Sequence, residues 1–210
     1  MPSFFTPCYC LMKTEPSQQS SKSTLRTELR QKRAALPDQA RRGLDKAINH
    51  HLLGFVESVN ADLIAAYMAF DGEPDLSPAL ATLRDQGKVI ALPVISVEPG
   101  RATIHFRQWT EDCELRKNRY GILEPSGTDE LHLPDVDLTL VPLVGWSASG
   151  ARLGMGASFY DRLFQPFARF ERPLRIGVGY GVQEVDDIPL EPWDIRMHGI
   201  LSENGCERCS

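Results

Sequence analysis

A glycine-rich segment in the second half of the chain carries the residue types and spacing best suited to chemistry. An apolar run at 138–144 predicts a buried strand, and apolar residues at helical spacing from Phe159 onward predict a helix. The segment between them contains Gly145, Gly150, Gly154 and Gly156. Such a loop can wrap a phosphate, because glycines allow close backbone approach and free N–H groups at a helix start favour an anion. Arg152 adds a positive charge, and Asp161 adds a carboxylate that can reach a magnesium ion beside that phosphate.

The familiar phosphate-binding loops do not match this segment. Its first two glycines have the spacing of a Walker A loop, but Ala151-Arg152 stands where Lys-Ser/Thr is required. Its last two glycines begin a dinucleotide fingerprint, but Phe159 stands at the third glycine position. Spacing alone therefore leaves a plain structural turn and an anion site equally open.

Apolar periodicity predicts the elements that must position this segment. Strands are expected at 63–70, 88–93, 102–109, 138–144 and 174–180, and helices before Pro37, at 38–55, at 77–87 and after the glycine-rich segment. A strand–helix–strand order implies a parallel crossover, whereas the half-exposed pattern at 102–109 predicts an antiparallel excursion. We therefore expect an α/β three-layer sandwich, with a mostly parallel sheet and helices on both faces. In such sheets, ligands bind beyond the carboxyl ends of the strands.

The segment from Arg152 to Asp161, RLGMGASFYD, resembles the R-L-G-x-G-x-G-Y-Y-D signature of the 5-formyltetrahydrofolate cyclo-ligases, also called methenyltetrahydrofolate synthetases. That family uses ATP and magnesium to close 5-formyltetrahydrofolate to 5,10-methenyltetrahydrofolate, with release of ADP and phosphate. The resemblance implies an ATP-dependent ligase that forms a C–N bond. The formyl oxygen attacks the γ-phosphate, and N10 then displaces phosphate from the imino-phosphate. Such chemistry depends on positioned cations and backbone donors, so no acid–base residue is expected.

Basic residues open the expected fold. Lys22 and Arg26 are four positions apart and share one helical face, which by itself most simply indicates a solvated surface. In the cyclo-ligases a Lys-x-x-x-Arg pair at this place contacts ATP. The resemblance therefore implies an ATP site made of Lys22, Arg26, Arg152, Gly154, Gly156 and Tyr160.

The segment from Tyr67 to Glu73 follows a predicted strand and resembles the family's folate-contacting segment. The resemblance implies that Met68 and Glu73 contact the folate, with Met155 and Phe159 in the same pocket. A carboxylate suits this role because it can accept two N–H groups from one edge of a pterin ring. The substrate can also carry a polyglutamate tail.

The metal site implied by the resemblance combines two distant carboxylates. Residues 183–194 resemble the family's closing pattern, which places a second magnesium-linked carboxylate at Asp194 beside Asp161. Magnesium prefers oxygen ligands and keeps several waters, so two carboxylates can be sufficient. Without the resemblance, Asp194 would be read as a turn residue.

Length and charge limit the classes of protein and partner. The 210 residues suit one domain with tails, and we expect an N-terminal tail at 1–21, a cyclo-ligase-like α/β domain at 22–203 and a C-terminal tail at 204–210. No run approaches the ~18 apolar residues of a membrane span. The net charge of −5 argues against a general nucleic-acid binder. We expect a cytoplasmic monomer that acts on a small molecule, with neither a nucleic acid nor a membrane as partner.

The five cysteines allow one further site. Cys8 and Cys10 together with Cys206 and Cys209 would make a zinc site only if the two termini met. Free thiols in a reducing compartment are the simpler interpretation. None of the five histidines has metal-ligand spacing.

Several departures from the family pattern keep alternatives open. Ala157 stands where some members place lysine, and Phe159 replaces a tyrosine with the loss of only a hydroxyl. Trp146-Ser147 replaces the usual Phe-Asp, and Ser158 replaces the third glycine, where the loop can need a conformation that a β-carbon resists. One alternative is a non-catalytic relative that binds nucleotide or folate. Another is a sugar-phosphate isomerase or a CoA-transferase-like protein on a similar sheet, which would not require magnesium and ATP.

Overall fold

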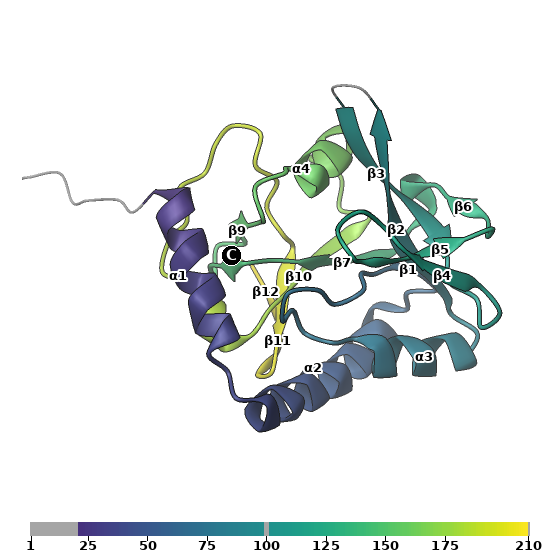
Figure 1. Cartoon of the computed structure of the whole chain (residues 1–210), viewed down its shortest axis with the longest axis horizontal. Coiled ribbons are helices and arrows are strands. Elements are labelled where there is room, and N and C mark those ends of the chain that lie inside the picture. Colours follow the sequence, from purple (N-terminus) through teal and green to yellow (C-terminus); the bar gives the residue numbers. More distant parts are fainter. Residues whose placement is uncertain (1–20, 99–100, 210) are drawn as a thin grey trace, which may run out of the picture.

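The computed structural model describes residues 21–98 and 101–209, and an eight-stranded sheet runs through its middle (Figure 1). The strands lie in the order β12 (Gly205–Arg208), β11 (Gly199–Ser202), β10 (Leu174–Val178), β7 (Leu138–Pro142), β1 (Leu63–Ala65), β2 (Val89–Glu98), β3 (Arg101–Gln108) and β6 (Glu130–Leu131). The run from β11 to β2 is parallel, and the strands at both edges are antiparallel. Two hairpins stand apart from this sheet: β4 (Glu114–Lys117) with β5 (Leu123–Ser126), and β8 (Gly145–Trp146) with β9 (Arg152–Leu153).

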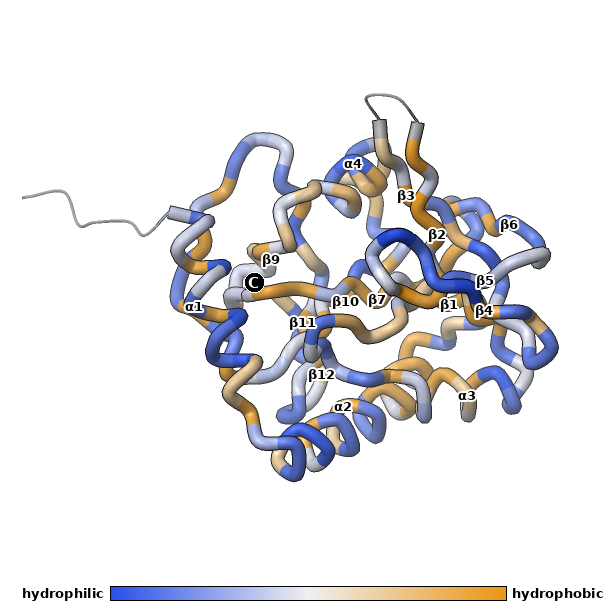
Figure 2. Tube along the Cα trace, viewed as in Figure 1, coloured by the Kyte–Doolittle hydropathy of each residue, from blue (hydrophilic) through white to orange (hydrophobic). Residues whose placement is uncertain are grey.

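Helices cover both faces of the sheet, as predicted. α2 (Asp38–Val59) and α3 (Ser77–Asp85) pack on one face (Figure 1) through the apolar stripe that includes Ile48, Leu52 and Leu80. The other face packs against α4 (Phe159–Phe164) and the short helices η1 (Leu133–Asp135) and η2 (Gln165–Phe167). Hydrophobic residues concentrate in the central strands between these layers (Figure 2). The predicted three-layer α/β sandwich is therefore confirmed.

A third, smaller apolar cluster holds α1 (Lys22–Ala34) against the β8–β9 hairpin, near η3 (Gly181–Gln183). Leu29 is its contribution from the helix. Gly145 packs directly against it, and a β-carbon there would lie 2.4 Å from Leu29 Cδ1, so the leucine side chain would have to shift. Ser21 caps α1 by accepting a hydrogen bond from the Thr24 N–H at 3.3 Å.

Two strands differ from the predicted length by more than the two residues seen in β7 and β10. The run at 63–70 contains only the three-residue β1, because the chain leaves the ladder after Ala66 and turns at Asp71 and Gly72, where φ is +52° and +77°. The apolar residues that follow β1 suggest a longer strand in the sequence, but in the structure they are buried as part of a loop. By contrast, β2 continues past residue 93, because β3 supplies a partner for its far half.

The C-terminal segment is also different from the prediction. Where the sequence suggested a tail at 204–210, β12 pairs antiparallel with β11 at the edge of the sheet. Gly205, with φ of +132°, supports the tight reversal between the two strands. Polar residues in β12 concealed it, since an edge strand needs apolar residues on fewer positions.

The possible cysteine site receives no support from the part of the chain that is described. Cys8 and Cys10 lie outside the described residues. Cys206 packs toward the α2 layer and Cys209 toward the α4 layer, and in residues 21–98 and 101–209 no group of three His, Cys, Asp or Glu could hold a metal. Over the same residues, no helix is long and apolar enough to cross a membrane.

Candidate active site

A cavity of about 520 Å³ opens beyond the carboxyl ends of β1 and β7, where the topology predicts a ligand site. Its walls come from α1, the loop after β1, the β4–β5 hairpin, the glycine-rich segment with α4, and the loop before β11. All twelve residues singled out from the sequence line it: Lys22, Arg26, Met68, Glu73, Arg152, Gly154, Met155, Gly156, Phe159, Tyr160, Asp161 and Asp194. Segments more than a hundred residues apart in the chain thus meet in one place.

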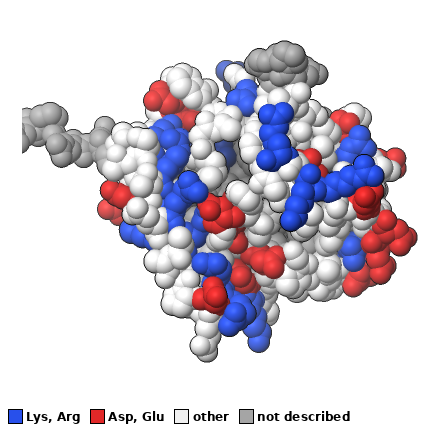
Figure 3. All heavy atoms as spheres, viewed as in Figure 1, with Lys and Arg blue, Asp and Glu red and all other residues white. Residues whose placement is uncertain are grey.

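The α1 end of the cavity is basic. The Lys22 ammonium forms an ion pair with the Asp194 carboxylate, and Arg26 Nε donates to the carbonyl of Gly154 at 2.8 Å. Figure 3 shows Lys and Arg side chains gathered over α1, beside the hollow in the middle of this face. Glycine is suited to position 156, where φ is +101° and a β-carbon would point at the Arg26 guanidinium 3.7 Å away. The helix cations and the loop therefore face one another across this end.

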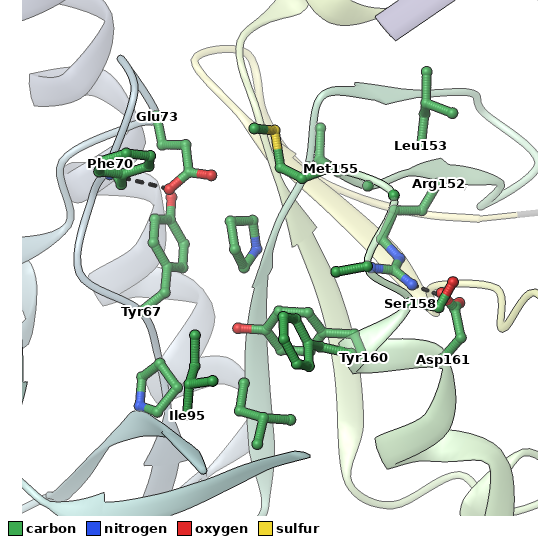
Figure 4. A pocket seen from close by; sticks show the side chains of 18 of the residues that line it. Tyr67, Phe70, Glu73, Ile95, Arg152, Leu153, Met155, Ser158, Tyr160 and Asp161 are labelled. Carbon is green, nitrogen blue, oxygen red and sulfur yellow. Dashed lines mark hydrogen bonds and ion pairs between the residues drawn. The ribbon is translucent and has the colours of Figure 1, made fainter. Parts of the chain in front are cut away.

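Arg152 lies deeper in the same end and is almost fully buried. Its Nη2 contacts Asp161 Oδ1 at 2.5 Å, and its guanidinium lies 5.7 Å from the centre of the Tyr160 ring (Figure 4). Asp161 Oδ1 also accepts the Ile195 N–H at 3.2 Å. Arg152 Nε is buried without a hydrogen-bond partner among the described residues. A buried cation with spare donor capacity suits an anionic ligand.

Ser158 stands where the family has a glycine, and its backbone adopts the left-handed conformation that this position suggested. Its φ of +49° is left-handed, and its side chain makes no capping bond to α4. A non-glycine residue in this region raises the free energy of the folded state. The residue is nonetheless accommodated, and it lines the cavity. Trp146 and Ser147 are buried in the β8–β9 region and do not line it, so these two departures lie away from the candidate site.

At the far end of the cavity, the Glu73 carboxylate has no ion pair among the described residues. Glu73 Oε2 accepts the backbone N–H of Phe70 at 3.1 Å, and the Glu73 carboxylate points into the cavity (Figure 4). Burial raises its pKa from 4.5 to about 7, and the hydrogen bond from Phe70 and the charge of Arg33 only partly oppose that rise. Near neutral pH this group can therefore exist in either protonation state.

Aromatic and apolar side chains connect the two ends. Tyr67 is buried and donates its hydroxyl to the Pro74 carbonyl at 2.9 Å. Burial raises the pKa of both Tyr67 and Tyr160, so both phenols stay neutral. Met155 and Trp193 line the mouth and are about half exposed, at 50% and 56%. A flat, partly apolar molecule with one charged end fits such a lining.

A hydrogen bond from a backbone N–H brings the two candidate metal ligands, Asp161 and Asp194, to the same part of the cavity. Asp161 binds the N–H of Ile195, the residue after Asp194, so both carboxylates border the same end of the cavity. Each is paired with a cation, Asp161 with Arg152 and Asp194 with Lys22. Magnesium is commonly coordinated by one or two carboxylates together with phosphate oxygens and waters, and the Asp161 and Asp194 carboxylates fit that coordination.

Several lining residues were not singled out from the sequence. The loop and strand of the β4–β5 hairpin contribute Asn118, Tyr120, Ile122 and Glu124. The Glu124 carboxylate accepts the Ile95 N–H at 2.9 Å and an Asn118 N–H at 2.7 Å. It thereby ties the hairpin to β2. No local pattern predicts the contact with Ile95, because it joins segments that are distant along the chain.

Comparisons with known proteins agree with the motifs. The model described as the 5-formyltetrahydrofolate cyclo-ligase family matches residues 18–203. The chain is 32% identical to a 5-formyltetrahydrofolate cyclo-ligase of Haemophilus influenzae, covering 90% of this chain and 99% of that protein. It is also 32% identical to that of Escherichia coli K12, covering 83% and 96%. The solved structure of an Aquifex aeolicus 5,10-methenyltetrahydrofolate synthetase matches with a TM-score of 0.76 at 31% identity, covering 90% of this chain and 92% of the other.

Proposed function

The chain belongs to the 5-formyltetrahydrofolate cyclo-ligase family, and from that premise we propose that this cavity closes 5-formyltetrahydrofolate to 5,10-methenyltetrahydrofolate with ATP. It is a ligase of one-carbon metabolism, and its products are the methenyl compound, ADP and phosphate. The observation that carries the proposal is the distribution of charge in a single cavity: at one end three cations stand with the Asp161 and Asp194 carboxylates, and at the other the Glu73 carboxylate has no ion pair among the described residues. Such a cavity can hold a polyphosphate and a pterin side by side.

The triphosphate of ATP is assigned to the α1 end. Lys22, Arg26 and Arg152 supply the positive charge, and Gly154 and Gly156 allow backbone groups to approach. Tyr160 forms part of the wall beside Arg152. Cations fixed in a partly buried site favour the charge that moves onto the phosphoryl group during transfer. The buried, unpartnered Nε of Arg152 supports this assignment.

Magnesium is assigned to Asp161 and Asp194. When bound, the ion would neutralise phosphate charge and orient the transferred group. The two carboxylates would turn from Arg152 and Lys22 toward the metal, which would free both cations for the phosphates. The four side chains would thus pair with one another in the absence of ligand, and with magnesium or phosphate when the ligands are bound.

The folate is assigned to the far end. Glu73, when ionised, can accept two N–H groups of the pterin ring, and Met68, Met155 and Phe159 supply apolar contact. The shared cavity brings the formyl oxygen near the phosphoryl group, so that a reaction between two molecules becomes one within a single complex. We propose that the chain acts as a monomer and also accepts polyglutamylated substrate.

The test is the absorbance of the methenyl product after purified protein is mixed with 5-formyltetrahydrofolate, magnesium and ATP. Growth of the band only when both ATP and magnesium are present is the expected result. A matched sample of the Arg152→Met variant controls for spontaneous cyclisation. Absence of the band, with folate or ATP binding still measurable by calorimetry, would overturn the catalytic proposal and leave a binding protein.

A further inference from the structure

The basic side chains of α1 contact segments around the whole cavity and not only those at its nucleotide end. Four of them, Lys22, Arg26, Arg30 and Arg33, contact segments that surround it. The first two meet the loop before β11 and the glycine-rich segment. The last two bind one carboxylate, Asp71 Oδ2, at 2.9 Å from Arg30 Nη2 and 3.0 Å from Arg33 Nη2. One side of a single helix therefore reaches both ends of the cavity.

The pair between Arg33 and Asp71 is half-buried: Arg33 lies in the interior, whereas the Asp71 side chain is 33% exposed. The Arg33 side chain is 1% exposed, and its Nη1 also donates to the carbonyl of Leu143, just beyond β7, at 3.3 Å. Exposed ion pairs contribute little, but removing one partner of a buried pair leaves a charge without compensation. Arg33 thus fixes Asp71 relative to both α1 and the end of the sheet.

Asp71 lies in the turn that presents Glu73. With Asp71 at φ +52° and Gly72 at φ +77°, the chain reverses direction within two residues. The turn is closed in both directions: the Glu73 N–H donates to the Phe70 carbonyl, and the Phe70 N–H donates to the Glu73 carboxylate, both at 3.1 Å. The direction of the Glu73 carboxylate therefore depends on the conformation of the residue that Arg33 holds.

Building on the proposed function, we propose that Arg33 and Asp71 are a positioning pair for folate recognition, which locks the Phe70–Glu73 turn so that Glu73 meets the pterin ring. Neither residue lines the cavity, so the pair acts through Glu73 rather than on the substrate. Because α1 also carries Lys22 and Arg26, the same helix aligns the folate and nucleotide ends with each other.

The variant that isolates this role is Asp71→Asn. Asparagine has the same size and tolerates a left-handed φ, so the turn can persist while the charge is lost. We expect the dissociation constant for 5-formyltetrahydrofolate, measured by calorimetry, to rise about tenfold, with that for ATP unchanged. Asp62→Asn is the matched control, since it breaks the exposed Asp62–Lys88 pair (2.7 Å) beside the start of β1 and should leave both constants unchanged.

The pH dependence of folate affinity separates positioning from a general loss of structure. The charge of Asp71 raises the pKa of Glu73 and the charge of Arg33 lowers it, while the neutral phenols of Tyr67 and Tyr160 complete the surroundings. In Asp71→Asn, the midpoint of the affinity curve should therefore move to lower pH. Arg33→Lys keeps the charge but loses the forked contact to Asp71 and Leu143, so it should weaken folate binding without that displacement.

Two results would overturn the inference. Wild-type affinity for folate in Asp71→Asn would show that the turn holds without the pair. Equal losses of folate and ATP affinity in Asp71→Asn would show a general structural effect. Failure of the wild-type protein itself to bind 5-formyltetrahydrofolate is a different outcome, which would refute the proposed function and the inference with it.

Discussion

The two ends of the cavity hold their carboxylates in different ways. At the α1 end, Asp161 and Asp194 are paired with Arg152 and Lys22. At the far end, Glu73 has no ion pair in the described part of the chain, and its pKa is raised to about 7. A ligand at the first end exchanges partners within an existing network, whereas a ligand at the second supplies donors to a carboxylate that burial disfavours. The first end should therefore depend on ionic conditions and the second on pH.

The largest effect is expected from breaking the paired end. Asp161→Asn removes a candidate magnesium ligand, and we expect turnover at saturating substrates to fall about a hundredfold or more, with folate affinity retained. The rate of methenyl absorbance is followed at increasing magnesium concentration. Asp187→Asn changes an exposed carboxylate outside the cavity and serves as the control. Full activity in Asp161→Asn would contradict the metal assignment.

The far end of the cavity is tested by Glu73→Gln, which keeps the shape of the side chain but loses the charge and one of the acceptor atoms. The Michaelis constant for 5-formyltetrahydrofolate should rise about tenfold, and that for ATP should stay unchanged. Initial rates at varied concentrations of each substrate give both constants. If the constant for ATP rises and that for folate does not, Glu73 belongs to the nucleotide end.

Glu73→Gln also tests the difference between the two ends of the cavity through the pH dependence of the free energy of unfolding. Because the pKa of Glu73 is raised from 4.5 to about 7 in the folded protein, the folded state binds more protons than the unfolded state within that window. Stability contributed by this group is therefore present at low pH and lost as pH rises toward 7. Glu73→Gln should exceed the wild type by about 1–2 kcal/mol at pH 8 and match it near pH 4.

Urea unfolding of Glu73→Gln at the two pH values measures this difference, with the exposed Glu111→Gln as the matched variant. Equal stability at pH 8 would mean that the Glu73 carboxylate is well solvated in the folded protein. In that case the contrast between the two ends would rest on pairing alone.

The smallest effect concerns the loop between the two ends. Ser158→Gly removes the strain of a left-handed φ of +49° and should stabilise the protein by no more than about 1 kcal/mol. Thermal unfolding with Ser58→Gly as a comparison tests this, because position 58 lies inside α2, where glycine destabilises. A loss of stability in Ser158→Gly would show that the side chain has a favourable role in the loop.

Local sequence motifs predicted which charged residues and glycines line the cavity, but not the other segments that enclose it. The glycine-rich segment reaches the cavity because it follows β7, a central parallel strand, whereas the basic pair of α1 and Asp194, in the loop before β11, were found by their motifs. The roles of these residues remain predictions. The strained backbone at Ser158 was also foreseeable, since a missing glycine points to the φ that it would have adopted.

The remaining walls depend on contacts that no local pattern records. The β4–β5 hairpin closes over the cavity because Glu124 binds Ile95, 29 residues away. The ion pair of Arg33 joins residues 38 positions apart, and on its own helix Arg33 looks like a solvated charge. The edge strand β12 was mistaken for a tail because its pairing with β11 is made by backbone groups.

The span of α1's contacts also has a consequence for synthesis. Lys22 meets Asp194 across 172 positions, and Arg26 meets Gly154 across 128. A nascent chain that has not yet reached residue 194 can form α2, α3 and the first parallel strands, but its phosphate-binding end lacks one wall. The nucleotide therefore cannot assist the early steps of folding on the ribosome, because the nearly complete chain must acquire its fold before this end of the cavity is closed.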